Sequence, residues 1–181
     1  MKRDNLIHLL NAYEPLGEEA IYKAGMIKFI ESNENCFERS LAIGHITASS
    51  WLLNKGRSKA LLMHHSTLGR WLQPGGHCDG DPDVLRVAIR EAREESGITQ
   101  IEPISKNIFD IDIHLIPENG REKSHYHYDV RFLLRVASDE EVVKNLESKE
   151  LRWVGKDKSE LPTNELSVVR MFNKSILFTP F

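Results

Sequence analysis

The sequence is poor in cysteine, carries little excess charge and lacks long hydrophobic runs. Its two cysteines, Cys36 and Cys78, exclude a disulfide framework and a Cys-rich zinc module, and they favour a reducing compartment. With 24 basic and 27 acidic residues the formal net charge is −3, so the chain has no electrostatic tendency to bind nucleic-acid polymers or anionic membranes. No apolar run reaches the roughly 18 residues that span a bilayer, and the Leu6–Leu10 segment is too short for a signal peptide. We therefore expect a cytoplasmic protein.

The rest of the composition is that of a folded protein with a sizeable core. A chain of 181 residues with 40% hydrophobic and 28% charged residues fits one main domain. Near the N-terminus two helical patterns occur, one that Asp4 can cap and one over residues 18–32. They predict a helical N-terminal extension over residues 1–40, ahead of a main domain over residues 41–181.

The main domain alternates strand and helix patterns. Strands are expected over residues 43–53, 60–65, 109–115, 126–136 and 151–154, and helices over residues 82–96, 140–146 and 164–177. Residues 71–81 form a loop rich in glycine and acids, after which Asp81 is the expected cap and Pro82 the first residue of the helix over 82–96. This order of elements predicts an α/β fold.

Three carboxylates lie on one side of the predicted helix over 82–96. Glu91, Glu94 and Glu95 are spaced i, i+3 and i+4. On an arbitrary helix such residues would form a solvated face neutralised by nearby arginines. Here the helix follows a glycine-rich loop whose carbonyl groups can add oxygen ligands, and oxygen ligands are those that Mg²⁺ prefers. The pattern therefore indicates metal-assisted phosphoryl chemistry.

The same residues carry a family resemblance. Gly76, followed at a fixed spacing by the run REAREESGI over residues 90–98, resembles the signature of Nudix hydrolases. Residues 71–75 also fit the approach to that signature. One departure is Pro82, which stands where the family pattern has its first glutamate. The resemblance implies a Nudix-type α/β/α sandwich with a mixed sheet, preceded here by the short helical extension.

The resemblance also implies a metal site. Carried over position by position, Glu91, Glu94 and Glu95 hold the metal together with a main-chain carbonyl at Gly75, and Arg90 orients a glutamate. The implied cofactor is Mg²⁺, which Mn²⁺ can replace. The loss of the first acid at Pro82 affects efficiency more than mechanism, because the family places its metal-binding core on the later glutamates.

The implied reaction is hydrolysis of a diphosphate linkage by an activated water. The substrate is a small molecule, a nucleoside diphosphate derivative or a related organic pyrophosphate. Glu91 or Glu95 is the general base within the signature, and Glu147 or Glu150 is the candidate outside it. Arg90, Glu91 and Glu95 are therefore the expected catalytic residues. The sequence identifies no particular substrate, and it permits a homodimer through the N-terminal helices.

A second polar group involves histidines. His125, His127 and Asp129 share one face of the predicted strand over 126–136, and His77 lies in the glycine-rich loop. Strand histidines commonly only pack, whereas His-x-His with an acid can also bind a transition metal or line a pocket. We expect these four residues to contact substrate.

Three other interpretations fit the residues less well. A non-catalytic nucleotide-binding regulator is conceivable because of Pro82, but retention of a self-repelling carboxylate cluster argues against it. An enzyme similar to isopentenyl-diphosphate isomerases would carry Cys-Gly-His where this chain has Gly75-Gly76-His77. A calcium loop starting at Asp79 fails because Val84 stands where that loop needs glycine.

Overall fold

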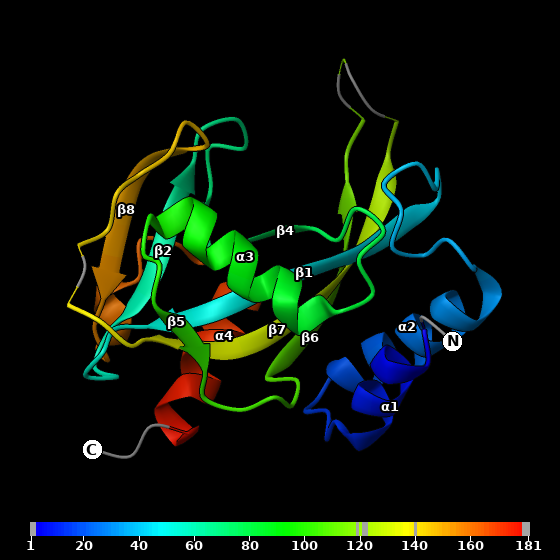
Figure 1. The fold of residues 1–181 in the computed structure, drawn as a ribbon, viewed down its shortest axis with the longest axis horizontal. Coiled ribbons are helices and arrows are strands. Elements are labelled where there is room, and N and C mark those ends of the chain that lie inside the picture. Colours follow the sequence, from blue (N-terminus) through cyan, green and yellow to red (C-terminus); the bar gives the residue numbers. More distant parts are fainter. Residues whose placement is uncertain (1–2, 119, 121–122, 140, 179–181) are drawn as a thin grey trace. The chain divides into compact units, whose positions relative to one another are not determined.

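The computed structural model describes residues 3–118, 120, 123–139 and 141–178, which form helices and strands joined by turns and longer loops (Figure 1). The helices are α1 (Asp4–Ala12), α2 (Glu19–Ser32), α3 (Val84–Ser96) and α4 (Leu166–Phe178), with a 3₁₀ turn η1 (Lys158–Glu160). The strands are β1 (Gly44–Leu53), β2 (Ala60–His65), β3 (Trp71–Leu72), β4 (Gly75–His77), β5 (Ile101–Pro103), β6 (Asp110–Ile116), β7 (His125–Val136) and β8 (Ser148–Val154). None of the described helices is both long enough and apolar enough to cross a membrane.

The chain forms two compact units. The first contains residues 1–49, 76–88 and 106–132, and the second contains residues 50–75, 89–105 and 133–181. Within the described part of the chain, eight strands belong to one sheet with the order β3-β2-β1-β7-β5, while β4 pairs with β1, β6 with β7 and β8 with β2. The α/β fold predicted from the sequence is confirmed.

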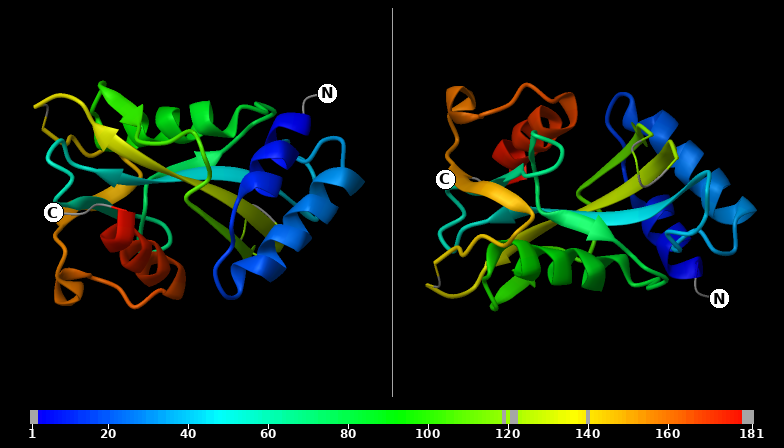
Figure 2. Two further views of the ribbon diagram at one scale, coloured as in Figure 1. Left: turned by 90° about the horizontal axis from the view of Figure 1, so that it is seen from below. Right: turned by 90° about the horizontal axis from the view of Figure 1, so that it is seen from above.

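In the first unit, α1 and α2 lie side by side and α2 packs on β6 (Figure 2). The contact is apolar because each helix buries one stripe of side chains. The buried members of these stripes are Leu6, Leu10, Met26, Phe29 and Ile30. Phe29 stacks on Tyr128 of β7 with ring centroids 3.9 Å apart. Gly25 lets the helix approach the sheet, since a Cβ atom there would lie 3.1 Å from Ile113 Cδ1.

The opposite face of β6 and β7 is polar. Arg131, only 2% exposed, donates from Nη1 to Asp110 at 3.0 Å and from Nε to Asp129 at 2.7 Å. Asp129 also accepts hydrogen bonds from Thr47 at 3.0 Å and from Ser49 at 2.7 Å. Although burial by itself would lower the pKa of Arg131, the surrounding aspartates raise it. This buried network stabilises the arrangement of β1, β6 and β7 in the first unit.

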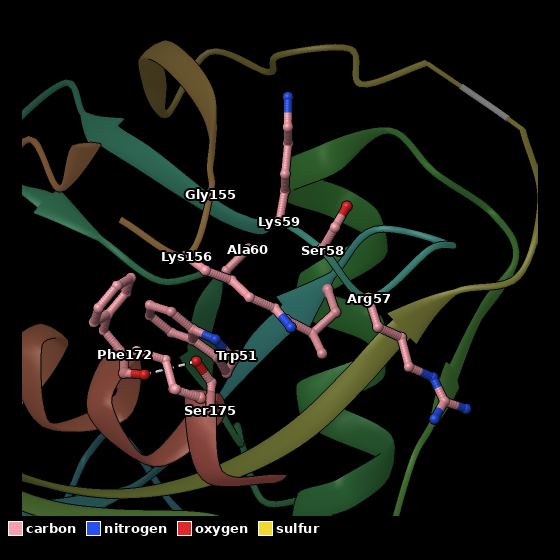
Figure 3. A pocket seen from close by; sticks show the side chains of 11 residues that line it. Trp51, Arg57, Ser58, Lys59, Ala60, Gly155, Lys156, Phe172 and Ser175 are labelled. Atoms are coloured by element: carbon pink, nitrogen blue, oxygen red, sulfur yellow. Dashed lines mark hydrogen bonds between the residues drawn. The ribbon is translucent and has the colours of Figure 1, made fainter. Parts of the chain in front are cut away.

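In the second unit, β2 is the central strand. It pairs antiparallel with β1, β3 and β8. Residues 89–96 of α3 and the helix α4 lie on opposite faces of these strands (Figure 2), which is the layering expected of an α/β/α sandwich. Beside α4 lies a pocket of about 10 Å³, room for about one water molecule, lined by residues that include Trp51, Lys59 and Phe172 (Figure 3). There Ser175 donates a hydrogen bond to the carbonyl of Phe172 at 2.7 Å.

The start of α3 differs from its prediction. The helix begins at Val84 rather than Pro82. Asp83 caps it, because its Oδ1 accepts the backbone N–H of Arg86 at 3.1 Å. Asp81, the expected cap, instead accepts the N–H of Asp83 at 2.9 Å and pairs with the Arg86 guanidinium at 2.7 Å. Asp83 takes the capping role because α3 begins at Val84, which makes Asp83 the residue directly before the first turn.

The prediction of a helix over residues 140–146 is wrong. Residues 141–146 are irregular or in a turn, and Glu140 lies outside the described residues. The segment forms hydrogen bonds with the end of α3. Val143 donates its N–H to the carbonyl of Ser96 at 2.7 Å, and the Asn145 amide donates to the carbonyl of Glu94 at 3.3 Å.

Two smaller predictions are also wrong. Residues 71–81, expected to be a loop, contain the short strands β3 and β4. The N-cap of α1 is Arg3 and not Asp4.

Candidate active site

The three carboxylates of α3 differ in burial. The second half of α3 belongs to the second unit, where Ala92 faces the core. Glu95 lies close to the same side and is 3% exposed, while the side chain of Glu91 is 14% exposed. Glu94 turns outward, with 61% of its side chain exposed. The helix therefore places two carboxylates in a low-dielectric environment and one at its solvent edge.

Glu95 is held by the residue that the sequence resemblance assigns to the metal site. Its Oε2 accepts the backbone N–H of Gly75 at 2.8 Å. Burial raises the pKa of Glu95 to about 8, against the Gly75 hydrogen bond, which lowers it. The charges of Glu91, Glu147 and Glu94 raise it further. A carboxyl group with such a pKa takes up a proton or a cation near neutral pH.

Arg90 lies against two of the glutamates. It donates from Nη2 to Glu91 Oε1 at 2.6 Å, and its Nε lies 3.9 Å from Glu94 Oε1. Burial raises the pKa of Glu91, and the hydrogen bond and charge of Arg90 oppose that rise. The arginine thus holds the Glu91 carboxylate in one orientation.

Of the two candidate acids outside the signature, the structure brings Glu147 to this cluster. Its charge raises the pKa of both Glu91 and Glu95. Its backbone is anchored because its carbonyl accepts the N–H of Ser66 at 2.7 Å. Glu150 is instead engaged by Arg152 at 2.7 Å on the surface of β8.

This donor set fits a hard divalent cation. The charge of Glu147 raises the pKa of both Glu91 and Glu95, so the three carboxylates repel one another when all are ionised. Carboxylate and carbonyl oxygens are the ligands of Mg²⁺ and Mn²⁺, and a bound cation would offset that repulsion. Gly75 is at the site through its N–H.

The predicted histidines come together in the first unit, with one addition. The Nε2 atoms of His125 and His127 are 3.2 Å apart, and the His77 ring lies edge-on to His127 with centroids 5.0 Å apart. The addition is His45 of β1, whose ring centroid is 4.8 Å from that of His127. The sequence pattern of β1 could have indicated His45, because side chains alternate along a strand and His45 therefore lies on the same face as Thr47 and Ser49.

Asp129, the fourth residue expected at the substrate, belongs to the ion-pair network of Arg131. Asp129 lies on the same face of β7 as His127, but its carboxylate oxygens bind Thr47, Ser49 and the Arg131 guanidinium. A role of these residues in substrate binding stays a prediction.

His77 and His127, which are half-buried, are poor bases. Burial lowers the pKa of His77 to about 4, with further lowering by the charge of Arg39, and burial lowers the pKa of His127 to about 2. Both rings are therefore neutral at pH 7, and each neutral imidazole has one nitrogen that carries a lone pair.

Comparisons with known proteins identify the family of the chain. The NUDIX domain family matches residues 44–172, which is most of the chain. The uncharacterized Nudix hydrolase YvcI of Bacillus subtilis is 38% identical over 64 residues, which make up 33% of this chain and 40% of that protein. The match thus spans less than half the length of that curated relative.

Solved structures agree with this assignment. A NUDIX-family hydrolase from Clostridium perfringens is 25% identical, with a TM-score of 0.55, and the match covers 75% of this chain and 98% of that one. A MutT protein from Methanosarcina mazei shares the fold at 22% identity and a TM-score of 0.58, over 75% and 94% of the two chains. An Ap4A hydrolase from C. elegans shares it at 21% identity and a TM-score of 0.56, over 74% and 96%. The match over residues 44–172 shows that the chain belongs to the Nudix family.

Proposed function

We propose that the protein hydrolyses the diphosphate linkage of a nucleoside diphosphate derivative or a related organic pyrophosphate, with Mg²⁺ or Mn²⁺ as cofactor. The observation that carries this proposal is Glu95, a carboxylate that is almost fully buried beside other carboxylates and held by the N–H of Gly75. A chain that only bound nucleotides would gain nothing from keeping such a destabilising charge.

The proposed metal ligands are Glu91, Glu94, Glu95 and the main-chain carbonyl of Gly75. A bound divalent cation would supply charge neutralisation for the diphosphate and a lowered pKa for the attacking water. Glu95 is restrained by its hydrogen bond to Gly75, so it is already ordered for this role. Glu94 is more exposed and lies at the solvent side of the group.

The proposed catalytic residues are Arg90, Glu91 and Glu95. Arg90 orients Glu91 through the 2.6 Å hydrogen bond. Glu91 accepts the proton of the attacking water, because burial raises its pKa toward the range in which a carboxylate is an effective base at neutral pH. Glu147 is the alternative base, since it is anchored beside the same group.

The proposed substrate class agrees with the name of one solved structure that shares the fold, an Ap4A hydrolase, and a MutT protein shares the fold as well. Neither identity exceeds 22%, so we extend only the phosphoanhydride chemistry to this chain. We also propose a cytoplasmic protein with a helical extension over residues 1–40 and a Nudix domain over residues 41–181. A homodimer stays a prediction.

The test is a substrate panel run with two matched variants. Nucleoside di- and triphosphates, sugar nucleotides and dinucleotides are incubated with Mg²⁺ or Mn²⁺, and phosphorylated products are separated by chromatography. We expect Glu95→Gln to lower kcat by about 100-fold or more. Glu102→Gln makes the same chemical change at a residue of β5 that pairs with Arg135 of β7, and it should leave activity unchanged.

Two outcomes would contradict the proposal. One is full Mg²⁺-dependent turnover by a folded Glu95→Gln protein. The other is binding of nucleotides without turnover of any member of the panel, which would identify a nucleotide-binding regulator. Circular dichroism of each variant separates a lost site from a lost fold.

A further inference from the structure

Three histidines from three strands of the first unit meet at one point. His45 lies on β1, His77 on β4 and His127 on β7, and β4 pairs with β1 (Figure 1). One potential ligand atom from each ring lies within 4.8 Å of the others. The ring centroids are 5.0 Å apart for His45 and His77, 4.8 Å for His45 and His127, and 5.0 Å for His77 and His127. His45 is 2% exposed, so the group is at least partly shielded from solvent.

We propose that His45, His77 and His127 bind one divalent transition-metal ion of the zinc type, at a site separate from the carboxylates of α3. The two sites differ in the ligand atoms that they offer to a metal. Imidazole nitrogens suit zinc, copper and nickel, whereas carboxylate and carbonyl oxygens suit Mg²⁺ and Mn²⁺. Three histidines leave room for a further ligand in a tetrahedral site.

The spacing of the rings suits this geometry. With metal–nitrogen distances of about 2.0–2.1 Å, two nitrogens of a tetrahedral site are about 3.4 Å apart. The atoms of the three histidines, which lie within 4.8 Å of one another, need to approach by at most about 1.4 Å. Rotation about the side-chain torsions of three imidazoles provides such a movement without a shift of the strands.

A neighbouring histidine orients one of the ligands. His125 Nδ1 lies 2.8 Å from the carbonyl of Lys123, which can only accept, so Nδ1 carries the proton. Nε2 of His125 lies 3.2 Å from Nε2 of His127, and when it accepts a hydrogen bond from that atom, Nδ1 of His127 keeps a lone pair for a metal. Hydrogen bonds of this kind fix the tautomer and direction of ligating histidines.

A fourth histidine packs against one of the three ligands. His114 lies edge-on to His127 with centroids 5.5 Å apart, and its Nδ1 is 3.1 Å from Asp112 Oδ2. The same oxygen lies 3.4 Å from Arg131 Nη2, so Asp112 connects His114 to the buried ion-pair network. A bound ion would connect β1, β4 and β7 and stabilise the first unit.

The test measures metal binding and not catalysis, so it is independent of the proposed hydrolase activity. Tag-free protein is stripped with a chelator and dialysed against Zn²⁺ in millimolar Mg²⁺, which occupies the carboxylate site. Elemental analysis should find one zinc per chain, and Zn²⁺ should raise the Tm. The variants His77→Ala and His127→Asn should lose about 100-fold or more in Zn²⁺ affinity.

Matched controls separate this site from other ligands. His8→Ala removes an exposed histidine on α1 and should bind zinc as the unmodified protein does. Cys78→Ser tests the buried thiol that follows His77 and should also retain zinc. Co²⁺ bound to the unmodified protein should show the visible bands of a tetrahedral site without a thiolate charge-transfer band, which tests the ligands even if a variant fails to fold.

Three results would overturn the proposal. They are the absence of stoichiometric zinc in the presence of Mg²⁺, unchanged affinity in a folded His77→Ala protein, and loss of the zinc in Glu95→Gln. The last result would assign the ion to the carboxylates instead of the histidines.

Discussion

The buried charge of Glu95 should destabilise the metal-free protein, so its removal should stabilise the fold. The pKa of this group rises from 4.5 to about 8 on folding. Between these values the folded state binds more protons than the unfolded state, and the free energy of unfolding therefore falls as pH rises. At 1.36 kcal/mol per pKa unit, the cost above pH 8 is at most about 5 kcal/mol. Glu95→Gln removes this cost and keeps an oxygen that can accept the N–H of Gly75.

Urea unfolding in EDTA at about pH 5 and about pH 8.5 measures the effect. We expect the variant to be close to the unmodified protein at the lower pH and more stable by about 2–5 kcal/mol at the higher pH. Millimolar Mg²⁺ should reduce the advantage of the variant at the higher pH, because only the unmodified site binds the ion well. Glu102→Gln should show no such pH dependence. A stability difference that is independent of pH, or a variant that is less stable at both values, would refute the reasoning.

Two further predictions concern the scaffold. Arg131→Met should lower the free energy of unfolding by about 3–5 kcal/mol, because it leaves the buried carboxylates of Asp110 and Asp129 without their cation; urea unfolding checks this, and a loss below about 1 kcal/mol would show that the network contributes little. Gly97→Ala should cost at least about 1 kcal/mol, since φ is +72° and the new Cβ would lie 2.8 Å from Val143 Cβ. An unchanged Tm for that variant would contradict the close packing.

Local patterns were sufficient for elements whose side chains alternate regularly. The strand predicted over 60–65 has those bounds in β2, and β7 begins one residue before its predicted start. Patterns failed where tertiary hydrogen bonds compete with local ones. Residues 141–146 have a composition that a helix could use, but Val143 and Asn145 bond to the end of α3. The short strand β5 was also missed, since it is defined by its pairing with β7.

The carboxylate site was largely readable from the chain. Helical periodicity is local, so the spacing of Glu91, Glu94 and Glu95 determined by itself that they share one side of α3. The sequence could not say that Glu95 is buried and Glu94 exposed, because burial depends on what packs against the helix. The contribution of Glu147 to the cluster likewise comes from the path of a distant segment.

The histidine site divides in the same way. The sequence determined that His125 and His127 point to one face of their strand, since side chains alternate with a period of two. Only the tertiary structure decided that His45 and His77 meet His127, because the pairing of β1 with β4 and β7 joins segments far apart in the chain. Local geometry assigns a residue to a face, whereas its neighbours on that face are set by nonlocal strand pairing.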